Sequence, residues 1–578
     1  SASPYARMGN WITSTFLRFD LFQRHQPNRF LEYTRVQHSN QSPAYSVRTA
    51  AEIVAHQRMK PNHSNDSDTD FSSDDEGCPK MTPHEEQQMF EREQHIAFSG
   101  RCHIGDPESC TQLRNEINSR CGPRPSTSNN MEFILNRDLQ KRGTSISNPR
   151  TVARVLNSHL PNQKRRVDRV ATKSFCTQYI QNGTKIVVAS QDEKIRFYQR
   201  NPDKSKYRSK YMKSDELRVD QCGWSILDTA ISLNGDLIAY GTWKDAVFVG
   251  KLDFTERQNI TWFPIDLNGE PGRDHCAVFC VKFSDSSEQI VCGTSQYSIH
   301  VFDVEQRRRI RTIVNAHEDD VNSVCFADLG SNLIYSAGDD GLVKVWDKRA
   351  WSDGDVEPVG VFAGHRDGVT HVDSRQDERY LLSNSKDQTI KVWDLRKFSN
   401  MSGVEATRAC VQSQHWDYRW QPAPPGLCQP VAGDTSVMTL RGHSVLHTLV
   451  RANFSPESTG RRYIYTGCAR GEVVVYDIMS GTVSRRLKGH TAVVRECDWH
   501  PTENEIVSSA WDGVTTVWTW DERQEGVIAP YDHPNISQFG DEDSCDELFQ
   551  PVKKQCRRQR KTMSSRGHPC SSSSISQN

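Results

Sequence analysis

Short segments in which apolar and polar residues alternate recur along the chain from about residue 175 to residue 520, separated by turns rich in Gly, Asp and Ser. Alternation with a period of two is typical of β-strands. The pattern is most complete in two copies of sixteen residues, IYSAGDDGLVKVWDKR from Ile334 and LLSNSKDQTIKVWDLR from Leu381. Repeats of about 40 to 45 residues that end in Trp-Asp indicate a β-propeller, in which every blade is a four-stranded sheet.

Seven such units can be counted. The steps from Asp303 to Asp347 and from Asp347 to Asp394 are 44 and 47 residues. Because one blade cannot bury both faces of its sheet, seven nearly even units predict a closed ring, an all-β, seven-bladed WD40 propeller. The expected ends of the third strands are Phe197-Tyr198, Phe248-Val249, Phe302-Asp303, Trp346-Asp347, Trp393-Asp394, Tyr476-Asp477 and Trp518-Thr519, so that Tyr198, Val249, Phe302 and Tyr476 replace Trp in four blades.

The propeller is predicted to occupy residues 166–530. A longer step of 83 residues before Asp477 indicates an insertion at 398–440, preceding blade six, and its segment Gln421–Gly426 (QPAPPG) is typical of a loop. Residues 1–80 contain an acidic, Ser-rich stretch and are expected to be largely disordered, as is a basic and Ser-rich tail at 531–578.

Residues 81–165 are expected to form short helices, a segment that could dock on an adaptor. One helix is predicted over 131–142, where Met131, Ile134, Leu135 and Leu139 lie near one face. A second opens at Asn148-Pro149 and places Val152, Val155 and Leu156 at helical spacing. We expect either helix to pack on the propeller or on a partner.

Three blades carry a His, a Ser, an Asp and a Trp at matched spacing. A Ser, a His and an Asp together are also the residues of hydrolase triads, but a catalytic site is needed once and this set recurs. We therefore interpret the sets as hydrogen-bonded networks that hold the blades together, and predict no enzyme. The sets are His317, Ser336, Asp340 and Trp346; His365, Ser383, Asp387 and Trp393; and His490, Ser508, Asp512 and Trp518.

The overall composition gives few further indications. The 72 basic and 73 acidic residues are balanced, so no global basic field indicates direct nucleic-acid binding. The seventeen cysteines show no C-x-x-C pair, and no apolar run is long enough to cross a membrane, which favours free thiols in a reducing compartment. Cys276 and Cys280 have no clustered partner ligands, so neither a metal nor a cofactor is expected.

Two short motifs concern localisation. Met8-Gly9-Asn10 matches an N-myristoylation start if the seven preceding residues are removed, and a membrane or mitochondrial association is expected only for such a form, with Gly9 acylated. A basic cluster in the tail is a candidate nuclear-import signal, formed by Lys553, Lys554, Arg557, Arg558, Arg560 and Lys561.

Two arginines extend the Trp-Asp pairs. Arg349 and Arg396 each stand two residues after the Asp, where the chain turns at the edge of one face, and adjacent blades would place them side by side. Arg is favoured at interface hot spots, so the pair is a candidate docking site. The same tetrapeptide also occurs at Trp416–Arg419, where no strand pattern precedes it, and we interpret that copy as coincidental.

The paired boxes resemble the adaptor-binding boxes of substrate receptors for cullin-4 RING ubiquitin ligases. From about Phe175 to Trp520 the chain is similar to the WD-repeat protein 23 family, also called cullin-4-associated factor 11. The stretches that carry the likeness are VDQCGWS from Val219, HEDDVN from His317, SNSKDQTIKVWDLRKFS from Ser383, HWDYRW from His415, GHSVLHTL from Gly442 and SSAWDG from Ser508.

The resemblance implies a substrate-recognition subunit that docks on the damaged-DNA-binding protein 1 adaptor, with cullin-4 and a RING subunit as further partners. The implied targets are cap-and-collar stress-response transcription factors, and the implied localisation is nuclear and cytoplasmic. The implied adaptor-binding residues are Trp346, Asp347, Arg349, Trp393, Asp394 and Arg396. Residues just before the turn Asp line the top opening of a propeller, and we expect targets to bind at Gln191, Lys244, Asp339, Lys386 and Trp511.

A different class of function remains open on the residues alone. A WD40 propeller could act as a scaffold for a chromatin- or RNA-associated complex without any ligase, because many propellers only bring proteins together. The two interpretations differ in whether both arginines are needed to capture the adaptor.

Overall fold

The computed structural model describes residues 102–121, 149–201, 210–219, 222–252, 260–267, 276–351, 354 and 356–522. The predictions for residues 1–80, for the helix at 131–142, for Gly9 and for the tail at 531–578 with its basic cluster lie outside these residues.

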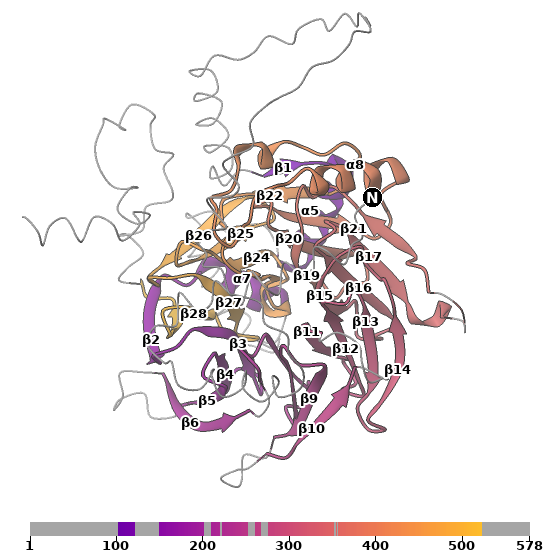
Figure 1. The fold of residues 1–578 in the computed structure, drawn as a ribbon. Helices are drawn as coiled ribbons and strands as arrows, with labels where there is room; N and C mark the ends of the chain where they lie inside the picture. Colours follow the sequence, from indigo (N-terminus) through magenta and orange to yellow (C-terminus); the bar gives the residue numbers. More distant parts are fainter. Residues whose placement is uncertain are drawn as a thin grey trace, which may run out of the picture. The chain divides into compact units, whose positions relative to one another are not determined.

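Seven β-sheets form a ring, which confirms the predicted seven-bladed propeller (Figure 1). Blades one to three consist of β3 (Ser174–Ile180), β4 (Lys185–Ser190), β5 (Lys194–Arg200) and β6 (Tyr211–Arg218); β7 (Asp228–Ile231), β8 (Leu237–Gly241), β9 (Ala246–Lys251) and β10 (Trp262–Asp266); and β11 (Val278–Phe283), β12 (Gln289–Thr294), β13 (Ile299–Asp303) and β14 (Arg308–Ile313). Blades four and five consist of β15 (Val321–Phe326), β16 (Leu333–Gly338), β17 (Val343–Asp347) and β18 (Gly360–Phe362); and β19 (Val369–Ser374), β20 (Tyr380–Ser385), β21 (Ile390–Asp394) and β22 (Met438–Leu440). Blades six and seven contain β23 (Ala452–Phe454), β24 (Tyr463–Gly467), β25 (Glu472–Asp477) and β26 (Thr482–Lys488); and β27 (Val494–Trp499), β28 (Glu505–Ala510) and β29 (Val514–Thr519).

The ring is closed by a strand from the other end of the chain. Strand β2 (Gln163–Arg169) pairs antiparallel with β29, with Gln163 opposite Thr519, and becomes the fourth strand of blade seven. It begins three residues before the predicted boundary at 166. Without β2 the third strand β29 would be the outer edge of blade seven, so β2 covers that edge.

In blade two the residue at the Trp position was predicted wrongly. Each of the other third strands places its Trp-equivalent opposite an Ile or Leu of the second strand, as Trp346 lies opposite Ile334. In blade two the residue opposite Ile238 is Gly250, not Val249. A Cβ at Gly250 would lie 2.9 Å from the ring of Trp262 in β10, so the fourth strand supplies the indole that the third strand lacks.

The insertion lies within blade five, between β21 and β22, and not before blade six. It contains the helix α8 (Met401–Gln412) and a 3-10 turn, η3 (Pro425–Cys428), and the predicted range at 398–440 also includes the strand β22. Asn400 caps α8, because its side chain accepts a hydrogen bond from Gly403 N. The sequence did not predict α8, since Val404 is the only large apolar side chain that the helix buries.

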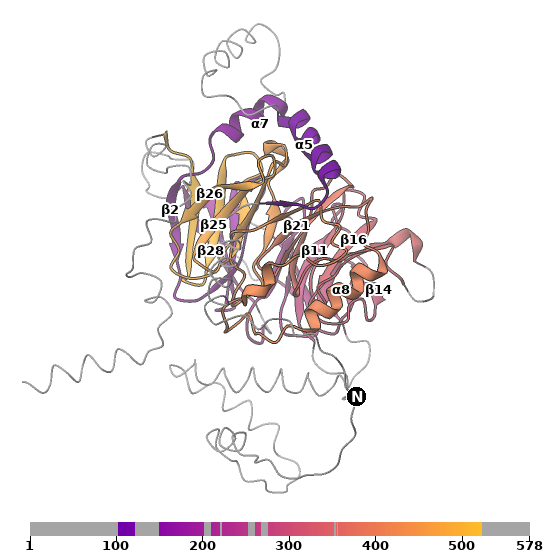
Figure 2. The ribbon, with the colours of Figure 1, turned by 90° about the horizontal axis from the view of Figure 1, so that it is seen from above.

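Two helices lie together along one side of the ring (Figure 2). The predicted helix at Pro149 is α7 (Pro149–Ser158), but its buried residues are Ala153 and Asn157, while Val155 is exposed. The side of α7 that faces the propeller therefore differs from the predicted one, because Asn157 turns inward and its side chain donates to the carbonyl of Thr459 at 3.2 Å. A further 3-10 turn, η4 (Glu457–Thr459), provides that acceptor.

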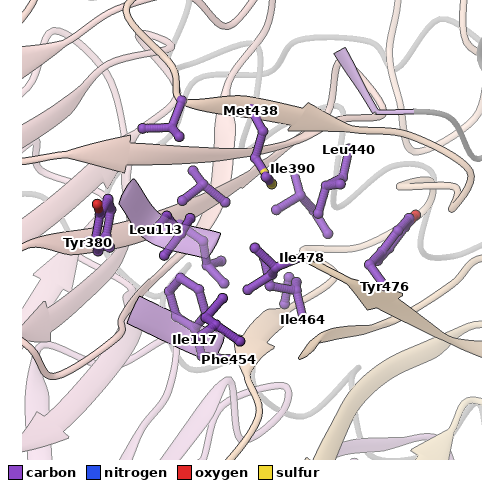
Figure 3. Packing of buried hydrophobic residues seen from close by; sticks show 14 of the residues in the cluster. Leu113, Ile117, Tyr380, Ile390, Met438, Leu440, Phe454, Ile464, Tyr476 and Ile478 are labelled. Atoms are coloured by element: carbon purple, nitrogen blue, oxygen red, sulfur yellow. The ribbon is translucent and has the colours of Figure 1, made fainter. Parts of the chain in front are cut away.

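Helix α5 (Pro107–Cys121) was not predicted. It follows the short strand β1 (His103–Ile104), which pairs with β22 as a fifth strand of blade five. Leu113 and Ile117 are fully buried in a cluster that includes Tyr380 of blade five and Tyr476 of blade six (Figure 3). The helix thus covers the junction between these two blades.

The structure contains the hydrogen-bonded networks that the spacing predicts. In blade five, His365 Nε2 lies 2.6 Å from Ser383 Oγ and His365 Nδ1 lies 2.9 Å from Asp387, while the indole of Trp393 donates to Ser383 Oγ at 2.8 Å. The equivalent bonds in blades four and seven lie between 2.7 and 3.4 Å. All of these His, Ser and Trp side chains are buried, as expected for groups that satisfy one another's polar atoms.

We expect His365→Ala to destabilise the protein by about 3 kcal/mol, because it leaves the buried Ser383 and Asp387 without their partner. Equilibrium unfolding in denaturant measures the change. His415→Ala is the control, since His415 is exposed and should be nearly silent. A cost below about 0.5 kcal/mol for His365→Ala would show that the network does not hold the blade.

Candidate functional site

The first rim arginine is held by its own Asp immediately after β17. Asp347 caps the 3-10 turn η2 (Lys348–Ala350) by accepting from Arg349 N at 2.9 Å. The guanidinium folds back on the same carboxylate, with Nε 2.9 Å from Oδ1 and Nη2 2.8 Å from Oδ2. The side chain of Arg349 is nevertheless 66% exposed, so the fork presents its outer edge to solvent.

The second rim arginine forms the same fork after β21. Arg396 Nε lies 3.0 Å from Asp394 Oδ1 and Nη2 lies 2.7 Å from Oδ2. Its side chain is 53% exposed, whereas that of Asp394 is fully buried. Since β17 and β21 are third strands of adjacent blades, both forks lie on the face where third strands end, which we call the rim face.

Electrostatics keep both forks ionised. The hydrogen bonds from Arg349 lower the pKa of Asp347 below its usual range. Burial acts to raise the pKa of Asp394, but the bonds from Arg396 outweigh it and the pKa is lowered. Both carboxylates therefore stay charged at neutral pH and keep holding the guanidinium planes in place.

Helix α5 makes the two arginines unequal. Gln112 Oε1 accepts from Arg396 Nη2 at 2.8 Å and from Arg379 Nη2 at 2.6 Å. Glu116, one turn further along α5, pairs with Arg379 as well. The hydrogen bonds that the structure gives Arg349 all go to Asp347, so only Arg396 is tied to the helix.

The contacts of Gln112 and Glu116 were missed at the level of sequence. Only a recognised helix at 107–121 would have revealed them, through the spacing of Leu113 and Ile117 on the adjacent side of the helix. Two cysteines and a serine complete the buried side of α5, so the apolar pattern was weak.

The rim face also exposes apolar side chains. Leu329 lies in the turn between β15 and β16 and is 68% exposed; the turn is tied to the first fork, because Lys348 N donates to Asn332 O at 2.9 Å. Leu233 occupies the equivalent turn of blade two and is 75% exposed. Apolar residues beside paired arginines give the rim face the mixed character of protein-protein interfaces.

The residues proposed to bind targets lie on the opposite face, at the turns between second and third strands, which we call the mouth face. Two of them meet there, because Lys386 Nζ lies 2.7 Å from Asp339 Oδ1. Trp511 is half-buried, and Lys173 Nζ lies 4.1 Å above its ring. Gln191 and Lys244 are also half-buried, and their side chains take part in neither of these two contacts. The backbone N–H of Gln191 donates to the backbone carbonyl of Lys173, and that of Lys244 donates to Thr242 Oγ1.

The third copy of the tetrapeptide, at Trp416–Arg419, forms an identical fork on the mouth face. Arg419 Nε lies 2.9 Å from Asp417 Oδ1 and Nη2 lies 2.8 Å from Oδ2. No strand precedes it, and its indole donates to Asp367 Oδ2 instead of a blade Ser. An Asp followed two residues later by Arg thus suffices to form the fork, and the preceding strand decides on which face it lies.

Within the described ranges no group of three His, Cys, Asp or Glu side chains is placed to hold a metal ion. Cys276 and Cys280 are both buried, and burial raises the pKa of Cys276 to about 12 and that of Cys280 to about 11. None of the described helices is both long enough and apolar enough to span a bilayer.

Comparison with known proteins identifies the repeats and the family. The family model of the WD domain, G-beta repeat, matches residues 308–347, 356–394 and 481–519, which end at the third strands of blades four, five and seven. The LEC14B protein of Lithospermum erythrorhizon is 36% identical over 411 residues, covering 69% of this chain and 84% of that protein; the LEC14B homolog of Prunus armeniaca is 36% identical over 398 residues, covering 67% and 81%.

A third relative is similar over nearly the whole chain. The DDB1- and CUL4-associated factor 11 homolog of Caenorhabditis briggsae is 73% identical over 540 residues, which cover 92% of this chain and 97% of that protein. The chain therefore belongs to the DDB1- and CUL4-associated factor 11 family of WD-repeat proteins.

Proposed function

We propose that this protein is the substrate-recognition subunit of a cullin-4 RING ubiquitin ligase, and that its rim face docks on the damaged-DNA-binding protein 1 adaptor. The observation that carries the proposal is the pair of exposed Asp-x-Arg forks on adjacent blades, Arg349 with Asp347 and Arg396 with Asp394. The name of the C. briggsae relative, which joins DDB1 and CUL4, supports the same partners.

The geometry of the forks suits docking. Nε and Nη2 of each arginine are held by the neighbouring Asp, so the guanidinium is oriented before a partner arrives and loses little side-chain entropy on binding. Nη1 of Arg349 and of Arg396 makes no hydrogen bond to any described residue and can donate to a carbonyl or carboxylate of the adaptor.

Helix α5 extends the proposed docking surface. Its inner side is buried on blades five and six, while Thr111, Asn115 and Ser119 form an exposed polar stripe on the outer side. Because Gln112 ties the helix to Arg396, a partner that bound the second fork would meet this stripe as well. The surface of a fork alone is small for a stable interface, and α5 supplies the additional area.

No catalytic group is required of this subunit. Holding a target beside the ubiquitin-charged enzyme converts an encounter into an intramolecular step and raises the local concentration of the reactants. In this proposal the rim face holds the adaptor and the mouth face holds targets, which we propose to be cap-and-collar stress-response transcription factors in the nucleus and cytoplasm.

Affinity capture of the tagged full chain from cells, with and without proteasome inhibition, tests the proposal. We expect the adaptor and cullin-4 in both samples, and target proteins that accumulate only when degradation is blocked. A WD40 scaffold without ligase function would instead capture the same partners under both conditions and no adaptor. Absence of the adaptor from both samples would overturn the proposed function.

A further inference from the structure

Five aromatic rings form a continuous arc on the mouth face across four blades. Trp511 lies 6.0 Å from Phe175 of blade one, which lies 5.8 Å from Trp224. Trp224 lies 6.0 Å from Trp243, and Trp243 lies 5.9 Å from Phe279 of blade three. The two Phe residues are buried and the three Trp residues are half-buried, so each Trp remains partly accessible over a fixed support.

Carboxylates gather on the same face over blades four and five. Lys386 is paired with Asp339, and Lys344 lies 4.0 Å from Asp340 in the same turn. Asp319 and Asp320 make no ion pair with a described residue, and Asp319 is exposed. Burial and the charge of Asp339 raise the pKa of the half-buried Asp320, and burial raises the pKa of Asp367 to about 6.

Two arginines on this part of the face are already paired with carboxylates. Arg408 pairs with Glu318, which precedes Asp319 in the chain. Arg419 belongs to the third fork, where both its Nε and its Nη2 face Asp417. A guanidinium held by its own carboxylate adds no net charge to the face. The mouth face over blades four and five is therefore acidic.

The arc and the carboxylates are parts of one surface. Gln388 Nε2 donates to the carbonyl of Lys386 at 2.6 Å and to that of Val445 at 3.0 Å. Val445 packs in the same cluster as Trp511, and Leu449 from the same loop packs in the same cluster as Trp224 and Trp243. One loop of blade six, residues 444–450, thus separates the acidic part from the aromatic part.

We propose that the mouth face binds an extended peptide segment that carries a Lys or Arg close to an aromatic or long aliphatic side chain. The cation lies against Asp319 and Asp320, which form no ion pair with a described residue, and the apolar side chain lies on the indole of Trp224 and beside that of Trp511, over whose ring Lys173 lies. Aromatic rings favour both apolar contact and cations above their faces, and opposite charge selects basic over acidic segments. The inference rests on the proposed function in one respect, namely that the segment belongs to a target.

Selection of peptides displayed on phage against the immobilised full chain tests this. We expect enriched peptides to combine a basic residue with an aromatic or aliphatic one, and a selected peptide, measured by fluorescence anisotropy, to bind more weakly as salt increases. Asp319→Asn with Asp320→Asn should weaken that peptide at least tenfold and remove most of its salt dependence. Asn has nearly the same size as Asp, and neither Asp319 nor Asp320 forms an ion pair with a described residue, so the melting temperature should be unchanged.

Two further variants separate the possible outcomes. Trp511→Leu should also weaken binding of the peptide, while Arg349→Ala with Arg396→Ala should leave it unchanged. The test of peptide binding at the mouth face is therefore independent of whether the rim face docks on the adaptor. Enrichment of acidic peptides, no enrichment at all, or a peptide affinity that is unchanged by Asp319→Asn with Asp320→Asn would overturn the proposal. Enrichment that requires removal of residues 531–578 would assign the surface to the chain's own basic tail and would overturn it as well.

Discussion

Replacing both rim arginines, Arg349→Ala with Arg396→Ala, is expected to reduce capture of the damaged-DNA-binding protein 1 adaptor at least a hundredfold. Each guanidinium is oriented by its own Asp and keeps Nη1 free of contacts to described residues, the geometry of an interface hot spot. Each single change should weaken capture about tenfold. Binding of the purified full chain to the adaptor, measured by biolayer interferometry, gives the values.

The chain offers a matched control for this experiment. Arg419→Ala removes the same fork from the mouth face, where Asp417 holds it with nearly the same distances, and should leave the adaptor affinity unchanged. The melting temperature of the double variant should stay close to that of the wild type, because an exposed arginine on its own neighbouring Asp adds little stability. Unaltered capture by the double variant would exclude the rim arginines from docking, and equal loss with Arg419→Ala would exclude a specific rim face.

The blades were predictable because their information is local and repeated. Third strands such as β17 (VKVWD) and β21 (IKVWD) alternate apolar with polar residues. Near its end each third strand has a Trp, Tyr or Phe, except in blade two, where the position is Gly250 and Trp262 of the next strand supplies the ring. Strand β2 was not predictable in this way. Its sequence QKRRVDR lies at the outer edge of blade seven with Val167 as its only large apolar residue, and pairing with β29 is decided by closure of the ring.

The candidate site was predictable in its chemistry and less so in its surroundings. The sequence identified Arg349 and Arg396, because Asp-x-Arg forms a fork from three consecutive residues alone. For Trp416–Arg419 the sequence correctly predicted that no strand precedes the tetrapeptide, but it did not predict that the same fork forms there. The contact of Arg396 with Gln112 joins residues 284 apart in the chain, and no local pattern contains it.

A buried charge cluster joins blades across the centre of the ring. Arg451, which precedes β23 in blade six, donates to Asp228 of blade two at 2.7 Å and to Glu496 of blade seven at 2.8 Å. Asp228 accepts in addition from Val281 N in blade three, and Glu496 accepts from Thr177 N in blade one. Five of the seven blades are thus connected through one guanidinium.

The charges of this cluster depend on one another. Burial alone would raise the pKa of Asp228, but Arg451 outweighs it and holds the pKa well below its usual range. A carboxylate with a lowered pKa in the folded state stabilises the protein above its unfolded pKa of about 4, and this contribution is lost as the pH falls through the folded value. At neutral pH the cluster is therefore fully charged and fully stabilising.

We expect Arg451→Met to destabilise the protein by about 3 to 5 kcal/mol at pH 7.5, because it leaves the buried Asp228 and the half-buried Glu496 without the guanidinium that bonds to both. Burial then raises the pKa of Asp228, so the folded variant takes up a proton that the unfolded chain does not bind, and its deficit relative to wild type should shrink as the pH is lowered to 5.5. Arg495→Met is the matched control: Arg495 is equally buried but donates to the carbonyls of Phe175 and Leu227, so its cost should not change over this range. Denaturant unfolding at both pH values measures the four differences, and a deficit of Arg451→Met that is independent of pH would show that the central cluster is not held together by charge.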